Sequence, residues 1–308
     1  MNWKINSILF LLVLISCKEE QKNETNNEIK KLESSYLIEA NILKDIVNQP
    51  NIKVIDFRKK DIYNNEHIEG AVNIWRRDIE DASYDYGGIM ASQTQIETLF
   101  GKLGIKTDDT LVIYDDIGLC DASRLWWLLQ NYNFDNVKML HGGITSWKAI
   151  GGKVTKQSTI INNTIFKLPE TSGMKYFVSK ESVLDAIKNK VVILDTRTPD
   201  EFSGKRQKKG AAKGGRIPTS IHIDWAEAVD YKGDKRLKTI ENLKQIYNKL
   251  NIKKNDPIIV YCHSGVRSSH TTFVLTQLLG YTNVKNYDGS WTEWSHFNHL
   301  PFETNNKL

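Results

Sequence analysis

Short apolar runs rich in valine and isoleucine alternate along this chain with longer stretches of mixed polarity. Runs of a few residues that are apolar throughout predict strands buried on both faces of a sheet. The mixed stretches predict helices at residues 95–103, 125–130, 239–250 and 268–279. Because strands and helices alternate, the pattern predicts an α/β fold in which parallel sheets are flanked by helices on both faces.

The same pattern of apolar runs and motifs occurs twice along the chain. Residues 54–58, Val-Ile-Asp-Phe-Arg, correspond to residues 193–197, Ile-Leu-Asp-Thr-Arg, and the apolar run 111–114 corresponds to 258–261. The spacing between the copies increases after the first of these matches, which predicts a longer loop at 203–215 in the second copy. The repeat is therefore a duplication of a whole domain and not a solenoid of short units.

The duplication predicts the division of the chain. One domain is expected at 35–160 and a second at 176–308, with a linker at 161–175 that contains Asn162-Asn163 and Pro169 and lacks periodicity. Residues 17–34 are mostly polar and carry no aromatic side chain, so they predict a flexible tether.

The first residues have the composition of a targeting signal. Lys4 precedes an apolar run at 8–15 that is too short to span a bilayer, as in a secretory signal peptide at 1–16. The end of the run, Ser16-Cys17, resembles a bacterial lipobox, which implies that Cys17 is lipidated and becomes the mature N-terminus. We therefore expect a lipid-anchored, extracytoplasmic protein of a bacterial cell envelope. A plain signal peptide with an incidental cysteine is the alternative.

Composition excludes several other classes. Of the 308 residues, 40% are hydrophobic and 26% charged, as in ordinary globular domains. The formal net charge of +5 is small and spread along the chain, so no nucleic-acid partner is expected. The three cysteines, Cys17, Cys120 and Cys262, exclude a disulfide framework, and no cysteine–histidine cluster has zinc spacing, so no metal is expected.

One cysteine lies in a loop suited to reactive chemistry. After the run 258–261, the chain continues as Cys262, His263, Ser264, Gly265, Val266, Arg267 and Ser268, with a helix expected to start near Ser268 or Ser269. A loop that enters a helix at the carboxyl end of a parallel strand gathers N–H donors around an anion. Together with Arg267, these donors should lower the pKa of a thiol. The alternative is a buried structural cysteine at a strand end.

This strand–loop–helix unit resembles the active site of the rhodanese family of sulfurtransferases, where a six-residue loop opens with the catalytic cysteine. The family's first signature is matched at 195–202 and 215–218 and its second at 287–294, with weaker versions of both at 66–70 and 141–147. The similarity covers roughly 35–305, and the tandem arrangement resembles thiosulfate and 3-mercaptopyruvate sulfurtransferases.

The resemblance implies two tandem rhodanese-like domains and a covalent mechanism. Cys262 would attack a small anionic sulfur donor, thiosulfate or 3-mercaptopyruvate, and become a persulfide held by N–H groups of the loop. A thiol, carried for instance by a thioredoxin-like protein, or cyanide would then accept the sulfur. No cofactor is implied. Asp115 stands in the first copy where Cys262 stands in the second, so the first domain is expected to be inactive and to form one wall of the cleft.

The resemblance also assigns donor binding to Arg197, the arginine of the Asp-x-Arg motif. A structural pair of Arg197 with Asp195 or Glu201 is the alternative. His263 and Ser264 match neither the thiosulfate-preferring nor the mercaptopyruvate-preferring subgroup, and Arg267 replaces the threonine typical of both. The sequence therefore leaves the donor open.

Other residues are expected to have structural roles. His67 and Cys120 are interpreted as packed side chains, although His67 could reach the cleft and Cys120 could serve as a second thiol. The basic insertion 205–216 is interpreted as a solvated, mobile loop in preference to a device that steers anions. Four tryptophans are expected in the core or between the domains: Trp126, Trp127, Trp291 and Trp294.

Two competing functions follow from the same residues. Cysteine phosphatases that share this fold need a wider loop, whereas only four residues separate Cys262 from Arg267. The sequence therefore disfavours a phosphatase. A module that keeps the fold but serves only in binding or redox chemistry is the remaining alternative, and persulfide formation would distinguish it from an enzyme.

Overall fold

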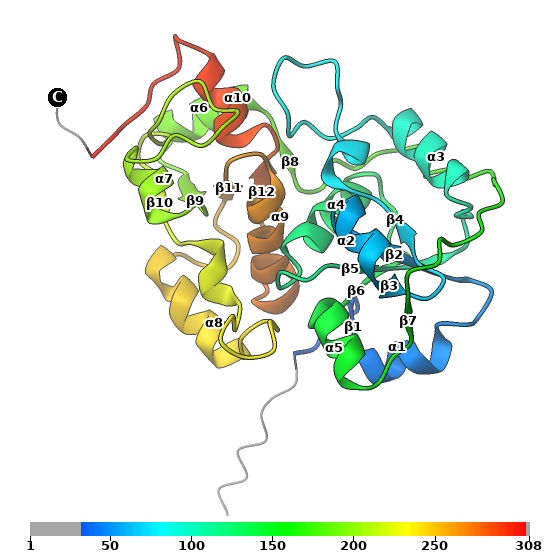
Figure 1. The fold of residues 1–308 in the computed structure, drawn as a ribbon. Coiled ribbons are helices and arrows are strands. Elements are labelled where there is room, and N and C mark those ends of the chain that lie inside the picture. Colours follow the sequence, from blue (N-terminus) through cyan, green and yellow to red (C-terminus); the bar gives the residue numbers. More distant parts are fainter. Residues whose placement is uncertain (1–31, 306–308) are drawn as a thin grey trace, which may run out of the picture. The chain divides into compact units, whose positions relative to one another are not determined.

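Two five-stranded parallel sheets organise the chain (Figure 1). In the computed structural model, which describes residues 32–305, the first sheet has the order β1-β6-β5-β2-β4 and the second the order β10-β9-β11-β12-β8. The strands of the first are β1 (Leu37–Ile38), β2 (Ile52–Asp56), β4 (Val72–Asn73), β5 (Thr110–Tyr114) and β6 (Val137–Leu140). Those of the second are β8 (Phe177–Val178), β9 (Val192–Asp195), β10 (Ile221–His222), β11 (Ile258–Tyr261) and β12 (Val284–Tyr287).

The two sheets repeat one topology, so the predicted duplication is confirmed in the fold. In the first domain, β5 lies between β2 and β6, and Val54 pairs with Val112. In the second domain, β11 lies between β9 and β12, and Ile193 pairs with Ile259. A small antiparallel pair, β3 (His67–Ile68) with β7 (Val154–Thr155), belongs to the first domain.

Helices follow most strands, as the mixed stretches predicted. They are α1 (Ala40–Ile46), α2 (Lys60–Asn65), α3 (Gln93–Lys102), α4 (Cys120–Asn131), α5 (Gly143–Ala149), α6 (Lys180–Lys188), α7 (Pro199–Ser203), α8 (Ile240–Tyr247), α9 (Val266–Phe273) and α10 (Ser290–His296). Single turns of 3-10 helix occur at η1 (Arg76–Ile79), η2 (Trp225–Ala228) and η3 (Asn248–Leu250), and a π-helical turn, η4 (Val274–Leu278), extends α9.

One predicted helix boundary is wrong. The helix expected to begin near Ser268 or Ser269 begins at Val266, directly after Gly265. Gly265 has a φ of +76°, a conformation that glycine adopts without strain, and it lets the chain turn into α9 earlier than the serines suggested. At its other end, α9 gives way to the π-helical turn at Val274, within the stretch predicted as one helix.

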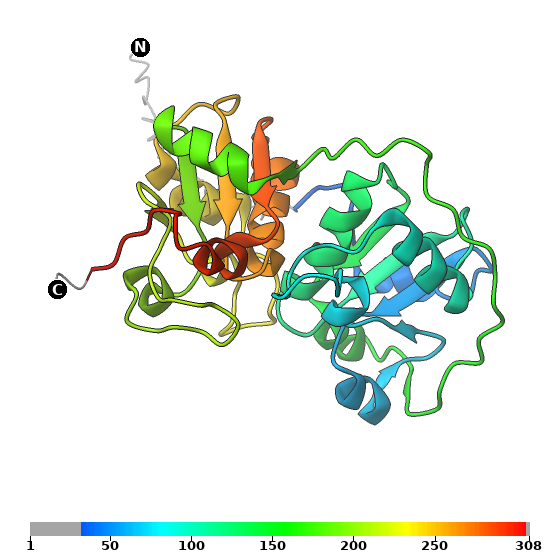
Figure 2. The ribbon, with the colours of Figure 1, turned by 90° about the horizontal axis from the view of Figure 1, so that it is seen from above.

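Each sheet is covered on both faces, which explains its continuous apolar strands. In β5, Leu111 and Ile113 join the core beneath α3 and α4, whereas Val112 packs with residues of α1 and α5. In β11, Val260 faces the core with α8 and α9, and Ile259 faces the side of α6 and α10. Figure 2 shows helices on either side of the second sheet.

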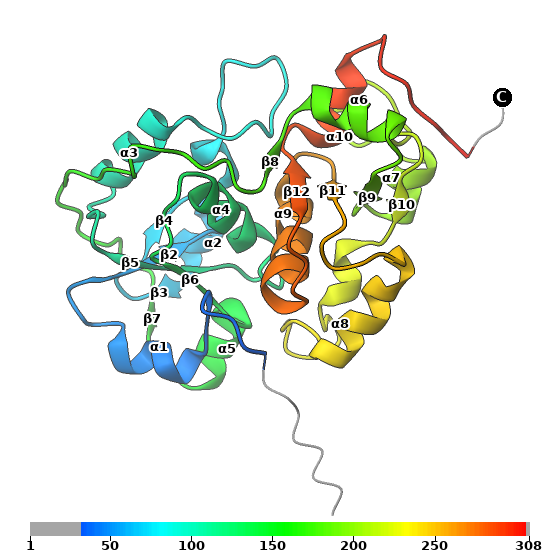
Figure 3. The same ribbon diagram turned by 180° about the vertical axis from the view of Figure 1, so that it is seen from behind.

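The domains meet through α4 and α9, which lie side by side (Figures 1 and 3). The Trp126 ring packs edge-on against Phe273, with centroids 5.0 Å apart, and also contacts Tyr176 at 5.5 Å. At the edge of this apolar contact, Arg124 and Asp288 form a fully buried ion pair of 2.7 Å between the domains. The interface is therefore a shared core with a fully buried charged pair that requires both partners.

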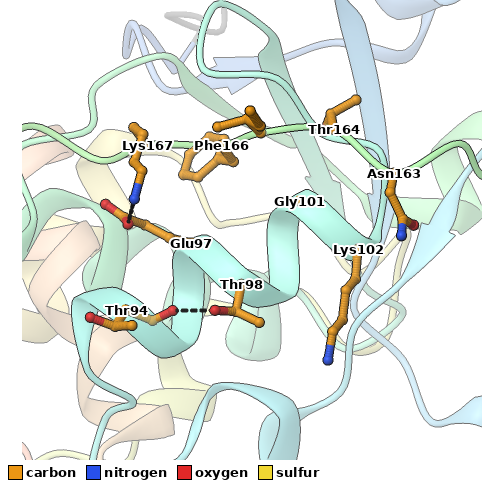
Figure 4. A pocket seen from close by; sticks show the side chains of 10 residues that line it. Thr94, Glu97, Thr98, Gly101, Lys102, Asn163, Thr164, Phe166 and Lys167 are labelled. Carbon is orange, nitrogen blue, oxygen red and sulfur yellow. Dashed lines mark hydrogen bonds and ion pairs between the residues drawn. The ribbon is translucent and has the colours of Figure 1, made fainter.

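The connection between the domains crosses the outside of α3 (Figure 2). No helix or strand occurs between Thr155 and Phe177, but Phe166 is buried against Phe100 and Phe134. Figure 4 shows the shallow groove of about 290 Å³ that the connection forms with α3, where Lys167 pairs with Glu97 at 2.8 Å. No residue of the Cys262 loop lines this groove.

The predicted signal peptide, Cys17 and most of the predicted tether lie outside the described residues. Within residues 32–305, the helices are too short or too polar to cross a membrane.

The buried pair between the domains generates a stability prediction. Asp288→Ala leaves Arg124 as an unpaired buried charge, so we expect the free energy of unfolding to fall by about 3–5 kcal/mol in urea titrations. The control is Asp185→Ala, which removes the exposed pair with Lys188 and should cost less than about 1 kcal/mol. Equal, small losses in both variants would contradict the importance of the interdomain pair.

Candidate active site

Cys262 follows β11 directly, at the carboxyl end of the central strand of the second sheet. The loop from Cys262 to Gly265 then turns into α9. A Cβ atom at Gly265 would lie 2.7 Å from Arg124 Nη1 and 2.8 Å from the Asp288 carbonyl oxygen. Both the positive φ and this close approach require glycine, so the turn brings the N-terminus of α9 back toward the Cys262 side chain.

The start of α10 holds this loop in place. The Ser290 hydroxyl oxygen accepts the N–H groups of Cys262 and Gly265, each at 3.1 Å. In return, the N–H of Trp291 donates to the Cys262 carbonyl at 3.0 Å, and the N–H of Thr292 donates to the His263 carbonyl at 2.8 Å. The motif at 287–294 is therefore the scaffold of the cysteine loop, which explains why the two occur together.

The Cys262 side chain is buried among donors and one positive charge. The Ser268 hydroxyl donates to Sγ at 3.4 Å, and the N–H groups of Ser264 and Ser268 also point to it. Burial by itself raises the pKa of the Cys262 thiol, but Arg267 and then these donors outweigh burial and bring the pKa below its ordinary value. The site thus stabilises a thiolate, the reactive form of cysteine.

Arg267 is fixed by a carboxylate that the sequence did not single out for this role. Its Nη1 and Nη2 bind the two oxygens of Glu201 at 2.7 and 2.8 Å, in a bidentate pair. Glu201 lies in α7, where it also accepts a hydrogen bond from the Thr198 hydroxyl at 2.9 Å. Arg267 lowers the pKa of this buried carboxyl, against the effect of burial, so Glu201 stays charged and holds the guanidinium beside the thiol.

Comparison with known proteins agrees with this geometry. The family model described as "Rhodanese-like domain" matches residues 39–150 and 179–297, one match in each domain. The chain belongs to the rhodanese family. It is 32% identical over 289 residues to the thiosulfate sulfurtransferase of Corynebacterium glutamicum, which covers 87% of this chain and 90% of that protein. It is also 32% identical over 280 residues to the sulfur carrier protein TtuD of Thermus thermophilus, covering 86% and 95%.

Two solved structures have the same architecture as this chain. SseA of Escherichia coli, described as a 3-mercaptopyruvate sulfotransferase, aligns with a TM-score of 0.73 and 26% identity over 84% of this chain and 99% of its own. EanB, in complex with ergothioneine linked to a persulfide, aligns with a TM-score of 0.80 but 20% identity, over 90% and 72% of the two chains. The second likeness shows the fold alone.

The first rhodanese domain forms the same loop around a carboxylate. Asp115, at the position that matches Cys262, accepts N–H donors from Ile117 at 3.2 Å, Leu119 at 3.0 Å, Asp121 at 2.9 Å and Ala122 at 3.1 Å. This loop therefore directs its N–H donors at a side-chain acceptor of its own domain. Asp115 supplies the acceptor oxygens but has no sulfur, and the inactivity of the first domain stays a prediction.

Arg197 is placed differently from its predicted role. It is buried, its Nε and Nη2 bind Asp195 at 3.0 and 2.5 Å, and Nη2 donates to the Gly215 carbonyl at 2.8 Å. Arg58 forms the same pair with Asp56 in the first rhodanese domain, which lacks the cysteine. The structure thus corresponds to the structural alternative, and donor binding by Arg197 stays a prediction without a contact in its favour.

The other loop residues have defined positions. His263 Nε2 lies 3.1 Å from the Lys209 carbonyl, so Nε2 must carry the proton. Burial, followed by the charges of Lys208 and Arg267, lowers the pKa of His263 to about 4, and the ring is neutral at pH 7. Ser264 lies against Gly88 of the first domain. Val266 is the first residue of α9.

The residues interpreted as structural are packed. His67 is buried and its ring nitrogens face the carbonyls of Tyr63 and Gln157 at 2.8 and 3.1 Å. Cys120 is the first residue of α4, and burial, followed by Asp121, raises the pKa of its thiol well above the ordinary value. Each of the four tryptophans is buried in the core or the interface: Trp126, Trp127, Trp291 and Trp294.

The basic insertion is more closely attached than the sequence predicted. Its Ala212 N–H donates to the Ser295 hydroxyl at 2.9 Å, and the Lys213 carbonyl accepts the Trp291 indole N–H at 2.9 Å. Arg216 pairs with Glu303 at 3.2 Å. The insertion is therefore attached to α10, and through the Lys209 carbonyl it also contacts His263, whereas the sequence predicted a solvated, mobile loop.

The donors around Cys262 generate a prediction for its titration. Ser268→Ala removes one hydrogen bond that favours the thiolate, so the pKa of Cys262 should rise and its alkylation rate at pH 7 should fall. The measurement is the pH profile of iodoacetamide alkylation, followed on the Cys262 peptide by mass spectrometry. In the control Ser269→Ala, the lost hydroxyl bonds the Gly265 carbonyl instead, and the midpoint should not move. An unchanged midpoint in Ser268→Ala would contradict the role of this donor.

Proposed function

We propose that this chain is a sulfurtransferase that carries sulfane sulfur on Cys262. The observation that supports it most is the anion-binding loop found in both domains, which encloses a carboxylate in the first and a thiol of lowered pKa in the second. A fixed arginine beside the thiol and relatives named as thiosulfate sulfurtransferases point the same way.

The first half-reaction forms the persulfide. The Cys262 thiolate attacks the outer sulfur of thiosulfate, a bond forms between the two sulfurs, and the sulfur–sulfur bond of thiosulfate breaks. Sulfite leaves with the bonding electron pair, so no proton is required. The negative charge moves to the terminal sulfur of the persulfide, where the N–H groups of the loop and Arg267 can stabilise it, by the logic of an oxyanion hole.

The second half-reaction returns the thiolate. A thiolate or cyanide attacks the terminal sulfur, the bond between that sulfur and Cys262 Sγ breaks, and Cys262 keeps the electron pair. The charge thus returns to Cys262 Sγ, where Arg267 and the Ser268 hydroxyl stabilise it. Because the two substrates react in turn at one sulfur, ping-pong kinetics are expected. A thiol of a thioredoxin-like protein is our proposed acceptor in the cell envelope.

We propose thiosulfate as the donor in preference to 3-mercaptopyruvate. Three cations act on the Cys262 region, Arg76, Lys208 and Arg267, and such a site favours a compact dianion. The sulfurtransferase of Corynebacterium glutamicum is named for thiosulfate, whereas SseA of Escherichia coli is described with 3-mercaptopyruvate. Comparing persulfide loading from both compounds tests the choice.

The intact mass of the protein after treatment with donor tests the proposed chemistry. The wild type should gain the mass of one sulfur atom with thiosulfate, lose it with cyanide, and load more slowly from 3-mercaptopyruvate. Cys262→Ser should gain nothing because it lacks the nucleophile, whereas Cys120→Ser, the matched control, should load like the wild type. If the folded wild type gains no sulfur from either donor, the chain is instead a binding or redox module.

We further propose that the protein is anchored to the cell envelope by lipid on Cys17. The support is the apolar run that ends at Ser16-Cys17 and the polar stretch that follows it. An extracytoplasmic position would expose the enzyme to inorganic sulfur anions outside the cytoplasm.

Expression in a bacterium tests the anchor. The wild type should partition into the membrane fraction and incorporate labelled palmitate, and Cys17→Ser should do neither because lipid transfer requires the thiol. Cys120→Ser should behave as the wild type. Release of the wild type in soluble form, with cleavage but no lipid, would indicate a plain signal peptide.

A further inference from the structure

A segment of the first domain forms the wall opposite the cysteine loop. Gly88 approaches Ser264 so closely that a Cβ atom on Gly88 would lie 2.7 Å from the Ser264 Cβ. The Met90 N–H donates to Asp288 at 2.8 Å, and Arg124 donates to the Gly88 carbonyl at 2.9 Å. These contacts hold residues 88–90 against the loop that carries Cys262, and the Ala91 N–H donates to the Ile79 carbonyl at 2.9 Å, which joins η1 to the same wall.

Arg76 begins the short helix η1 of this wall. Its Nε and Nη2 bind Asp121 Oδ1 at 2.6 and 2.5 Å, and its guanidinium lies over the Trp75 ring, 5.1 Å from the centroid. About a third of the side chain, 32%, stays exposed. The guanidinium is thus held along one edge while another part of it remains accessible.

Arg76 lies near the cysteine loop across the domain boundary, because its partner Asp121 is three residues before Arg124 on α4 and Arg124 Nη1 would lie 2.7 Å from a Cβ atom at Gly265. Burial lowers the pKa of Arg76, but Asp121, with smaller effects from Cys120 and Cys262, raises it above its ordinary value. Lys208, on the basic insertion of the second domain, is close enough that Arg76 lowers the pKa of its amine, after the larger effects of burial and Arg267. Arg76 therefore belongs to the group of cations around the reactive sulfur, although it comes from the domain without a nucleophile.

The cations differ in what they can still bind. Arg267 uses both of its terminal nitrogens on Glu201, and Arg197 is committed to Asp195. Lys208 makes no ion pair within residues 32–305, so it adds charge but no fixed geometry. The guanidinium of Arg76 is fixed by Asp121 and is still partly accessible to solvent. A planar, fixed guanidinium with free N–H groups is suited to bind an oxyanion.

We propose that Arg76 binds the oxyanion group of the sulfur donor while the outer sulfur faces Cys262, and that Asp121 acts as its positioning residue. This inference rests on the proposed function and adds a specificity-determining residue from the first domain. The donor class it selects is a small molecule with a sulfonate-like or carboxylate head next to a transferable sulfur.

Asp121 is suited to this positioning role. It is buried in the first turn of α4, and its N–H donates to Asp115 in the loop of the first domain. Burial raises the pKa of its carboxyl to about 7 against the opposing effect of Arg76. The inactive loop of the first domain thereby sets the position of a side chain that acts at the active loop of the second.

The experiment separates donor binding from sulfur discharge. In Arg76→Gln, the KM for thiosulfate should rise about 10-fold or more, as expected for the loss of a hydrogen-bonded charge. Discharge of the preloaded persulfide to dithiothreitol, which has no anionic head, should keep the wild-type rate. Arg77→Gln is the matched control, since Arg77 is the exposed neighbour in η1 and its loss should leave the KM unchanged.

Two further variants test the geometry. Arg76→Lys should raise the KM for thiosulfate less than Arg76→Gln does, because lysine keeps the charge but lacks the planar fork. Asp121→Asn should also raise this KM by less than Arg76→Gln. A wild type that loads sulfur beside an Arg76→Gln variant with an unchanged KM overturns this inference and leaves the proposed function intact. Equal slowing of loading and discharge, with a lower melting temperature, would also overturn it by assigning Arg76 a structural role. A folded wild type that never loads would overturn the proposed function itself.

Discussion

The structure depends on one constraint: several backbone N–H groups at the carboxyl end of a central strand point at a single position and require a hydrogen-bond acceptor there. Buried N–H groups without an acceptor are costly, so this position cannot be left to an apolar side chain. In the first domain the carboxyl oxygens of Asp115 accept these N–H groups, although burial raises the pKa of this carboxyl. In the second domain the acceptor is Cys262, and the loop accordingly favours its thiolate in spite of complete burial.

This constraint explains why the two copies of the domain share one loop structure but differ in the residue that the loop encloses. Asp115 keeps the shape of the first loop but brings no sulfur, and α4, which starts from that loop, packs against α9. The shared core and the buried pair of Arg124 with Asp288 fix the wall of the first domain against the reactive loop. An inactive domain can therefore contribute charge and shape to the site without contributing a nucleophile.

Local sequence patterns were sufficient to predict most of the fold. Apolar runs buried on both faces predicted the parallel strands, and the order of motifs predicted two equivalent domains and the loop at Cys262. The start of α9 was misplaced, because the positive φ of Gly265 and not a serine cap determines where that helix begins. Arg197 was assigned to the donor from its motif, whereas its pairing with Asp195 depends on how β9 and the following turn bring the two side chains together.

The sequence by itself determined the fold class, the duplication, the position of the reactive cysteine and the loss of that cysteine in the first copy. These features follow from periodicity and from residues close together in the chain. Only the tertiary structure decided which charges act on the sulfur, because Glu201 meets Arg267, and Arg76 approaches Cys262, only after sheets and domains have packed. Electrostatic effects depend on distance and burial in space, and neither can be read from spacing along the chain.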